Sequence, residues 1–225
     1  MTSSGGPRPE VAVPPVVAEI ADGRQVRVVW ENQLGGLTCE VNAGSDRWFV
    51  LVTAAIPGQN AASSRWKAKP QIAVRAIGEG LRSMHESLPV NRCPFSWSAD
   101  DRLAELRRRV SEGRIDPTWW PAAGPPLRTG RVLDLLAETP PVDQLVVCHG
   151  DSCAPNTLLT DDGRWSAHVD LGALGTADRW ADLAVATWNV TLNYGAGWEN
   201  LLLDGYGVAL DAERSRYYRL LGRCY

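Results

Sequence analysis

Short runs of apolar and β-branched residues mark the first part of the chain as strand-forming. Residues 26–30, 37–41 and 47–52 are such runs, and turns rich in glycine and asparagine separate them. The residues before them are rich in proline, serine and glycine, so we expect a flexible arm over residues 1–20. The pattern predicts a small three-stranded sheet that follows this arm.

Beyond residue 58 the apolar residues recur at helical spacing. Ile77, Leu81, Met84 and Leu88 predict a helix over residues 71–88, with His85 on it as a core or surface residue. Serine or acidic residues at the starts of later segments resemble helix caps. We therefore expect further helices over residues 98–110, 129–136, 178–184, 198–206 and 211–221, and a proline- and glycine-rich loop over residues 113–130.

Three more short strands are predicted in the second half, over residues 145–148, 157–159 and 165–169. Asp161, Asp162 and Gly163 supply turn chemistry for a hairpin between the last two. Asn156 and Asp170 lie equally far from Gly163 along the chain, so we expect the hairpin to bring them opposite each other.

The polar residues at these strand ends form a pattern with a chemical meaning. His149, Asp151 and Asn156 give the order His-x-Asp-x-x-x-x-Asn, and Asp170 opens an Asp-x-Gly. Phosphoryl transfer needs a carboxylate near the acceptor hydroxyl and oxygen ligands for Mg²⁺. The pattern predicts Asp151 as the base and Asn156 with Asp170 as the metal ligands. The alternative is three unrelated polar residues at strand ends.

The runs HGDSCAPNTLL and HVDLGALGTADRWADLAVATWN resemble the aminoglycoside phosphotransferases, and the similarity extends from about residue 30 onward. The resemblance implies an α+β, two-lobed protein-kinase-like fold that uses ATP and Mg²⁺. It also implies supporting roles for His149 and Asp182, and its implied nucleotide contacts are Gly35, Gly36, Ala54 and Ile56.

The same resemblance sets the expected domain boundaries. Residues 1–52 would form a β-rich, nucleotide-covering N-terminal lobe, residues 53–58 a hinge, and residues 59–225 a mostly helical catalytic and substrate lobe. Kinases of this fold carry a phosphate-binding lysine on the third strand, paired with a glutamate on the following helix. Here the lysines are Lys67 and Lys69, after the hinge. We therefore expect an internal deletion of roughly 30–40 residues, the length of one helix, two strands and their connections.

Composition narrows the possible partners. The formal net charge of −3 provides no basic surface for nucleic acid, and no apolar run is long enough to span a membrane. The first residues lack the features of a secretory signal, and the five cysteines form no Cys-x-x-Cys pair. We expect a cytoplasmic protein that acts on a small molecule.

The activity that the resemblance implies is ATP-dependent phosphorylation of a hydroxyl on an aminoglycoside or similar small molecule. Ala173 stands where many relatives carry arginine after Asp-x-Gly, and acidic residues are few near Trp119 and at the C-terminus. One alternative is therefore another small-molecule kinase, of the choline, homoserine or macrolide type. The other is a catalytically impaired remnant that acts as a binding protein, which the absent lysine favours.

Overall fold

The structure is a computed structural model that describes residues 11–31, 36–44, 46–52, 55–114 and 129–222. The chain divides into two compact units, Met1–Ile56 (unit 1) and Pro57–Tyr225 (unit 2).

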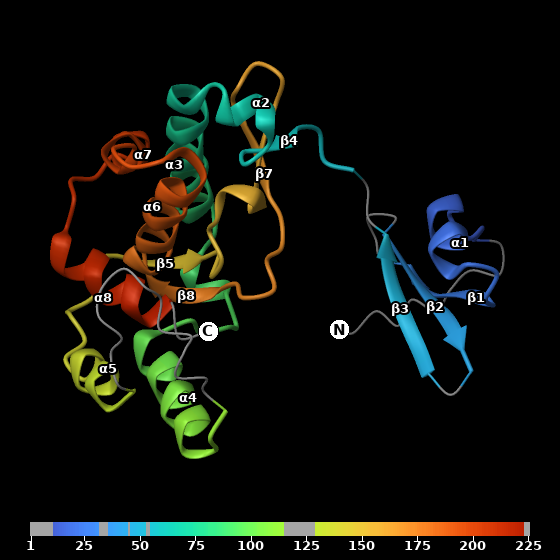
Figure 1. Cartoon of the computed structure of the whole chain (residues 1–225), viewed down its shortest axis with the longest axis horizontal. Coiled ribbons are helices and arrows are strands. Elements are labelled where there is room, and N and C mark those ends of the chain that lie inside the picture. The colour runs from blue at the N-terminus through green and yellow to red at the C-terminus, as the bar shows by residue number, and fades with distance from the viewer. Residues whose placement is uncertain (1–10, 32–35, 45, 53–54, 115–128, 223–225) are drawn as a thin grey trace. The chain divides into compact units, whose positions relative to one another are not determined.

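Unit 1 is built on an antiparallel sheet in the order β1 (Val26–Glu31), β2 (Leu37–Ala43) and β3 (Asp46–Val52). The sheet is preceded by a helix, α1 (Pro15–Ala21), where the composition predicted a flexible arm (Figure 1). Proline at the first helical position has a backbone angle suited to a helix start. Val17 and Ala21 on α1 are buried, as are Cys39 and Val41 on β2. The apolar residues of α1 therefore fix this part of the arm as a helix, and residues 1–10 lie outside the described part.

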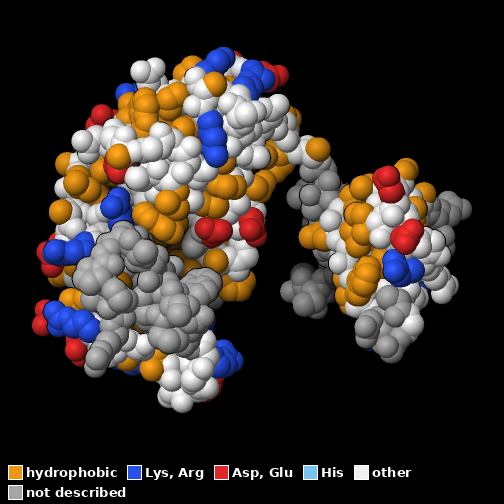
Figure 2. Space-filling view, in the orientation of Figure 1, with side chains coloured by type: hydrophobic (Ala, Val, Ile, Leu, Met, Phe, Trp, Pro, Cys, Tyr) orange, Lys and Arg blue, Asp and Glu red, His pale blue; other side chains and the backbone are white. Residues whose placement is uncertain are grey.

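The other side of this sheet carries exposed apolar residues. Phe49 and Leu51 on β3 are 62% and 64% exposed. Side chains alternate between the two faces of a strand, so these two share a face with the residues opposite them on β2, Glu40 and Thr38. Hydrophobic side chains are prominent on the visible face of this unit in the space-filling view (Figure 2). Within the described part of unit 1, no helix follows β3.

Unit 2 is mostly helical, and its helices surround short strands. The strands are β4 (Gln59–Asn60), β5 (Leu145–Cys148), β6 (Thr157–Leu159), β7 (Trp165–His168) and β8 (Gly175–Asp178). The α-helices are α2 (Ser64–Lys67), α3 (Pro70–Ser87), α4 (Ala99–Ser111), α5 (Thr129–Leu136), α6 (Trp180–Tyr194), α7 (Glu199–Tyr206) and α8 (Ala212–Gly222). Short 3-10 helices cover Val90–Arg92 (η1) and Ala154–Asn156 (η3). A single core, with Trp66, Ile77, Leu81 and Trp180 among its largest members, joins these elements.

The expected helices are present, and two of the expected caps are made by named hydrogen bonds. The Asp101 amide donates to the Ser98 hydroxyl at 3.1 Å, and the Arg214 amide donates to Asp211 at 2.9 Å. Strand β8 was not predicted, because its sequence Gly-Thr-Ala-Asp has no run of β-branched residues. It becomes a strand by pairing antiparallel with β5. Most of the expected loop over residues 113–130 lies outside the described residues.

Helices α3 and α7 pack closely because glycines lie at their contact. A methyl group on Gly78 would lie 2.1 Å from the carbonyl oxygen of Leu202, and one on Gly205 would lie 2.5 Å from that of Arg75. None of the helices in the described ranges has the length and apolar character needed to cross a bilayer.

This contact leads to a prediction about stability. Gly78→Ala should lower the free energy of unfolding by about 1–3 kcal/mol, because the added methyl group would overlap backbone atoms of α7 and force this helix away from α3. Gly130→Ala on α5 is the matched control, since a methyl group there meets nothing within 4 Å. The control should be neutral or slightly stabilising. Urea unfolding of both variants tests this, and equal free energies would contradict the close packing.

Candidate active site

The predicted catalytic residues lie on a loop that connects two buried strands. Strand β5 ends at Cys148, residues 149–153 form the loop, and η3 then leads directly into β6. The loop is short and both of its ends are buried, so its conformation is set by the elements around it. Gly150 adopts φ +86°, and a methyl group on it would lie 2.2 Å from the carbonyl oxygen of Ala173. Only glycine fits at this position without moving the loop.

Asp151 and Asn156 are in direct contact. The side-chain amide nitrogen of Asn156 donates to the carboxylate Oδ2 of Asp151 at 3.0 Å and to its main-chain oxygen at 3.0 Å. Asp151 is exposed, whereas Asn156 is only 9% exposed. Because the amide nitrogen makes both contacts, the amide oxygen of Asn156 is the atom that can serve as a ligand for a cation.

Asp170 lies next to this pair along the β6–β7 hairpin. Thr157 pairs with His168, and the Val169 amide donates to the main-chain oxygen of Asn156 at 2.9 Å. Asn156 therefore faces Val169, so the expectation that it lies opposite Asp170 is wrong by one residue. The turn is centred on Asp162 rather than Gly163, since Leu159 pairs with Trp165, and the register shift between Leu158 and Leu159 recovers only one of the two residues lost.

The backbone of Asp170 has an unusual conformation. Asp170 is exposed and adopts φ +61°, a left-handed conformation in which aspartate is one of the less disfavoured residues. The chain therefore turns sharply at the predicted metal ligand.

His149 connects the catalytic loop to the segment that leads to Asp170. Its ring is fully buried, with Nε2 at 2.9 Å from the carbonyl oxygen of Val169 and Nδ1 at 3.2 Å from the amide of Asp151. A carbonyl can only accept and an amide can only donate, so Nε2 carries the hydrogen. His149 therefore fixes the backbone on both sides of the predicted site.

Asp182 on α6 holds the start of the loop from the interior. Its Oδ2 accepts from the amide of His149 at 2.6 Å, and its Oδ1 accepts from the amide of Gly150 at 3.0 Å. Burial alone would raise the pKa of this carboxyl, but hydrogen bonds from His85 and the two amides outweigh it, and the net pKa is lowered. Asp182 is thus an ionised, fully buried acceptor below the catalytic loop.

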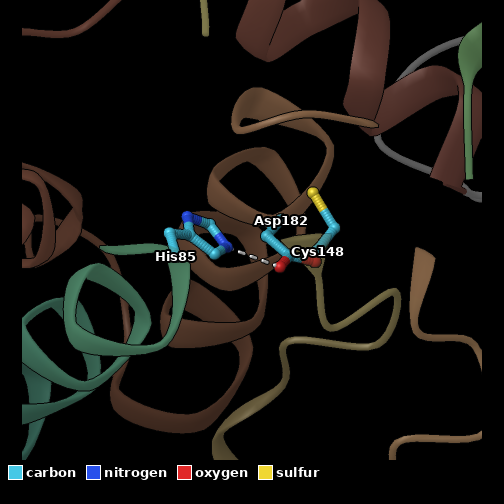
Figure 3. A group of neighbouring side chains, drawn as sticks. All are labelled: His85, Cys148 and Asp182. Carbon is cyan, nitrogen blue, oxygen red and sulfur yellow. Dashed lines mark hydrogen bonds and ion pairs between the residues drawn. The ribbon is translucent and has the colours of Figure 1, made fainter. Parts of the chain in front are cut away.

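A residue that the sequence did not mark as functional, His85, backs this carboxylate. Its Nε2 lies 3.0 Å from Oδ2 of Asp182 (Figure 3). Its Nδ1 lies 2.9 Å from the Tyr206 hydroxyl. Burial raises the pKa of Tyr206 to about 12, so this hydroxyl keeps its proton. The spacing of residues could have indicated that His85 is buried, because it follows Ile77 and Leu81 at intervals of four residues on α3.

His85, Cys148 and Asp182 also bring three possible metal-ligand atoms within 4.8 Å of one another. The chemistry argues against a cation there. Both oxygens of Asp182 already accept N–H groups, and burial raises the pKa of the Cys148 thiol well above its usual value. A protonated thiol is a poor ligand. The cluster is therefore a hydrogen-bonded support for the loop.

The structure describes only two of the four residues that are expected to contact the nucleotide. Gly35 and Ala54 lie outside the described residues. Gly36 is buried directly before β2, and Ile56 at the end of unit 1 is 44% exposed. The roles of these four residues stay predictions.

The described arginines of unit 1 make contacts with other side chains of this unit. Arg27 and Arg47 both pair with Glu40, at 2.6 and 3.6 Å, and Arg24 stacks over Trp48 with its guanidinium carbon 5.1 Å from the ring centre. The Arg27 guanidinium hydrogen bond outweighs the effect of desolvation, so the pKa of the Glu40 carboxyl is lowered. In the described part of unit 1, these three arginines supply the positive side chains.

Known proteins resemble the chain over nearly its whole length. The profile of the phosphotransferase enzyme family, APH, matches residues 12–219. An aminoglycoside 3'-phosphotransferase of Streptomyces fradiae is 36% identical, with 97% of this chain and 87% of the relative covered. That alignment spans 246 positions but includes only 97% of the 225 residues of this chain, about 218, so about 28 positions of the relative fall opposite gaps.

Solved structures give the same result. The structure of an aminoglycoside-3'-phosphotransferase of type VIII superposes with a TM-score of 0.68 at 25% identity, covering 90% of this chain and 94% of that one. An aminoglycoside phosphotransferase of Streptomyces rimosus, in complex with ADP and streptomycin, gives a TM-score of 0.65 at 27% identity, covering 92% and 78%.

The buried histidine beside this site, His168, should make stability depend on pH. Burial and the neighbouring His149 lower the pKa of His168 to about 4, from an ordinary value of 6.5. Below about pH 6.5 the unfolded chain binds a proton at His168, whereas the folded chain binds one there only near pH 4. The free energy of unfolding is therefore not reduced by this residue above pH 6.5, and it should fall by about 3 kcal/mol as the pH drops toward 4.

Urea unfolding between pH 7 and pH 4.5, for wild type and His168→Gln, measures this effect. The wild type should lose stability more steeply than the variant, since the other titrating groups are common to both proteins. Parallel curves for the two proteins would show that His168 does not titrate in this way.

Proposed function

The chain belongs to the aminoglycoside phosphotransferase family, and we propose that it transfers the γ-phosphoryl group of ATP to a hydroxyl of an aminoglycoside or similar small molecule. The observation that carries this proposal is the contact between Asp151 and Asn156 at the end of β5. It joins an exposed carboxylate to an amide whose oxygen can face a cation.

Asp151 is the proposed base. The acceptor hydroxyl would place its hydrogen against the Asp151 carboxylate, which takes the proton as the oxygen attacks the γ-phosphorus. One P–O bond forms to the acceptor, and the P–O bond to the β-phosphate breaks and releases ADP. The hydrogen bond from Asn156 to Oδ2 fixes the carboxylate, so it is oriented before the acceptor arrives.

The donor set fits Mg²⁺. Asn156 and Asp170 offer an amide oxygen and a carboxylate, the hard oxygen ligands that this ion prefers. They lie at the open end of one hairpin, where Asn156 and Val169 share a backbone hydrogen bond. When bound, the ion would neutralise charge on the nucleotide phosphates.

Nucleotide binding is proposed to be weak. The gaps in the alignment with the Streptomyces relative support an internal deletion, which we place in the N-terminal lobe between β3 and the hinge at residues 53–58. A Lys–Glu pair would be lost with that segment. Arg27 and Arg47 do not replace it directly, because both pair with Glu40.

The second candidate function is that of a binding protein with impaired catalysis, and it rests on the proposed weak binding of the nucleotide. Its acceptor would still be a small hydroxylated molecule, because the proposed base and ligands are all in unit 2. We favour the enzyme, since Asp151, Asn156 and His149 form an intact hydrogen-bonded set.

Transfer of radiolabelled phosphate from ATP to a panel of aminoglycosides tests the proposed function. Asp151→Asn should lower turnover by about 10²–10⁴-fold, the usual contribution of a general base. Asp204→Asn, which changes an exposed carboxylate on α7, should leave turnover unchanged. Wild-type turnover in the Asp151 variant would remove this residue from the mechanism.

A chimera tests the proposed weakness in nucleotide binding. Inserting, between β3 and the hinge, the corresponding segment of an intact family member, with its Lys and Glu, should raise kcat/KM for ATP by at least about tenfold, or roughly 1.4 kcal/mol. Steady-state kinetics of the two proteins give the comparison. Turnover of order 10 s⁻¹ in the natural chain, a typical enzyme rate, would contradict the proposal.

A further inference from the structure

The catalytic loop is hydrogen-bonded to α6 at several points, including the Ser152 hydroxyl, which donates to the main-chain oxygen of Asp182 at 2.8 Å. The attachment at the end of the loop involves a residue with no assigned role. Asp182 binds the start of the loop, and the Ala154 amide, at its end, donates to the side-chain oxygen of Asn189 at 2.8 Å. Asp182 and Asn189 are seven residues apart, so they lie on one face of α6, about 10 Å apart along its axis. Asp151 lies between the two attachments in the sequence.

The side-chain oxygen of Asn189 accepts from the one backbone amide of η3 that has no partner within this short helix. The first N–H groups of a helical segment have no partner within it. In η3 the second residue, Pro155, has no N–H, and the amide of Asn156 already donates to the carbonyl of Cys153 at 3.0 Å. The amide of Ala154 remains, and Ala154 is 1% exposed. Cys153, at the capping position, makes no side-chain cap.

The orientation of Asn189 is itself fixed. The side-chain nitrogen of Asn193 donates to Oδ1 of Asn189 at 2.8 Å and to its main-chain oxygen at 3.1 Å. Two donors therefore converge on the same oxygen of Asn189, one from the loop and one from the next turn of α6. The bonds from Asn193 lie within α6, so they orient the acceptor independently of the loop.

We infer that Asn189 is a positioning residue for phosphoryl transfer: by capping η3 it sets the position of Asn156, and through Asn156 the orientation of Asp151. The inference rests on the proposed function, because it concerns the ligand and the base of that reaction. Small displacements of such groups reduce turnover strongly without changing how the acceptor is bound.

Two substitutions of Asn189 distinguish the loss of the hydrogen-bond acceptor from a change in side-chain size. Asn189→Leu has a similar size and no acceptor, whereas Asn189→Asp keeps an acceptor oxygen at the same place. Thr191→Val is the control for simple destabilisation, since it removes a 2.6 Å hydrogen bond between α6 and Glu199 that does not involve the loop. Each variant is made in the full chain.

Asn189→Leu should lower kcat at least about tenfold and raise the Mg²⁺ concentration needed for half-maximal rate, with the KM for the acceptor almost unchanged. Asn189→Asp should restore most of the rate, and Thr191→Val should lower the melting temperature but leave kcat unchanged. The inference is overturned if Asn189→Leu keeps the wild-type kcat or if Asn189→Asp lowers kcat as much as Asn189→Leu does. It is also overturned if Thr191→Val lowers kcat as much as Asn189→Leu does.

Hydrogen exchange of the Ala154 amide, read by NMR, tests the cap without any activity. This amide should be protected in the wild type and in Asn189→Asp, and should exchange faster in Asn189→Leu. An unprotected Ala154 amide in the wild type would also overturn the inference, even if the leucine variant fails to fold. If the wild type transfers no phosphate but Ala154 is protected as expected, the proposed function fails while the cap stands.

Discussion

The fully buried carboxylate of Asp182 is the interaction on which the site depends. Burying an ionised group is costly unless each of its oxygens is hydrogen-bonded. Here amides of His149 and Gly150 and the ring of His85 supply those bonds. The donors come from α3 and from the catalytic loop, so the bonds that stabilise the charge also join these two parts to α6. The hydrogen bonds that stabilise this buried charge therefore also determine where the catalytic loop starts.

Much of this arrangement could be predicted from the sequence, because it is local. The spacing of Asp151 and Asn156 within one loop fixes their contact, and the periodicity of Ile77 and Leu81 fixes helix α3. The predictions that failed depended on backbone pairing and on contacts between distant segments. The β6–β7 turn is centred on Asp162 rather than Gly163, and a register shift then leaves Asn156 opposite Val169, which the residue types in the turn do not indicate. Likewise, the partner of His85 on α6 lies 97 residues away in sequence.

Unit 1 shows the opposite balance. Its three-stranded sheet is covered by α1 on one side, whereas Phe49 and Leu51 are exposed within the unit. A small sheet with one covered face buries little apolar area, which limits its stability. Its arginines are also committed to local contacts. The proposed catalytic residues all lie in unit 2, whereas the proposed weakness in nucleotide binding depends on unit 1.

Hydrogen–deuterium exchange of the peptides covering residues 145–156 tests the central claim most directly, by comparing wild type with Asp182→Ala and Asp151→Ala. Our account predicts faster exchange at His149, Gly150 and the rest of the loop in the Asp182 variant. The Asp151 variant should match the wild type at His149 and Gly150, because its side chain holds neither amide. Unchanged exchange in Asp182→Ala would contradict the claim that this buried carboxylate sets the geometry of the loop.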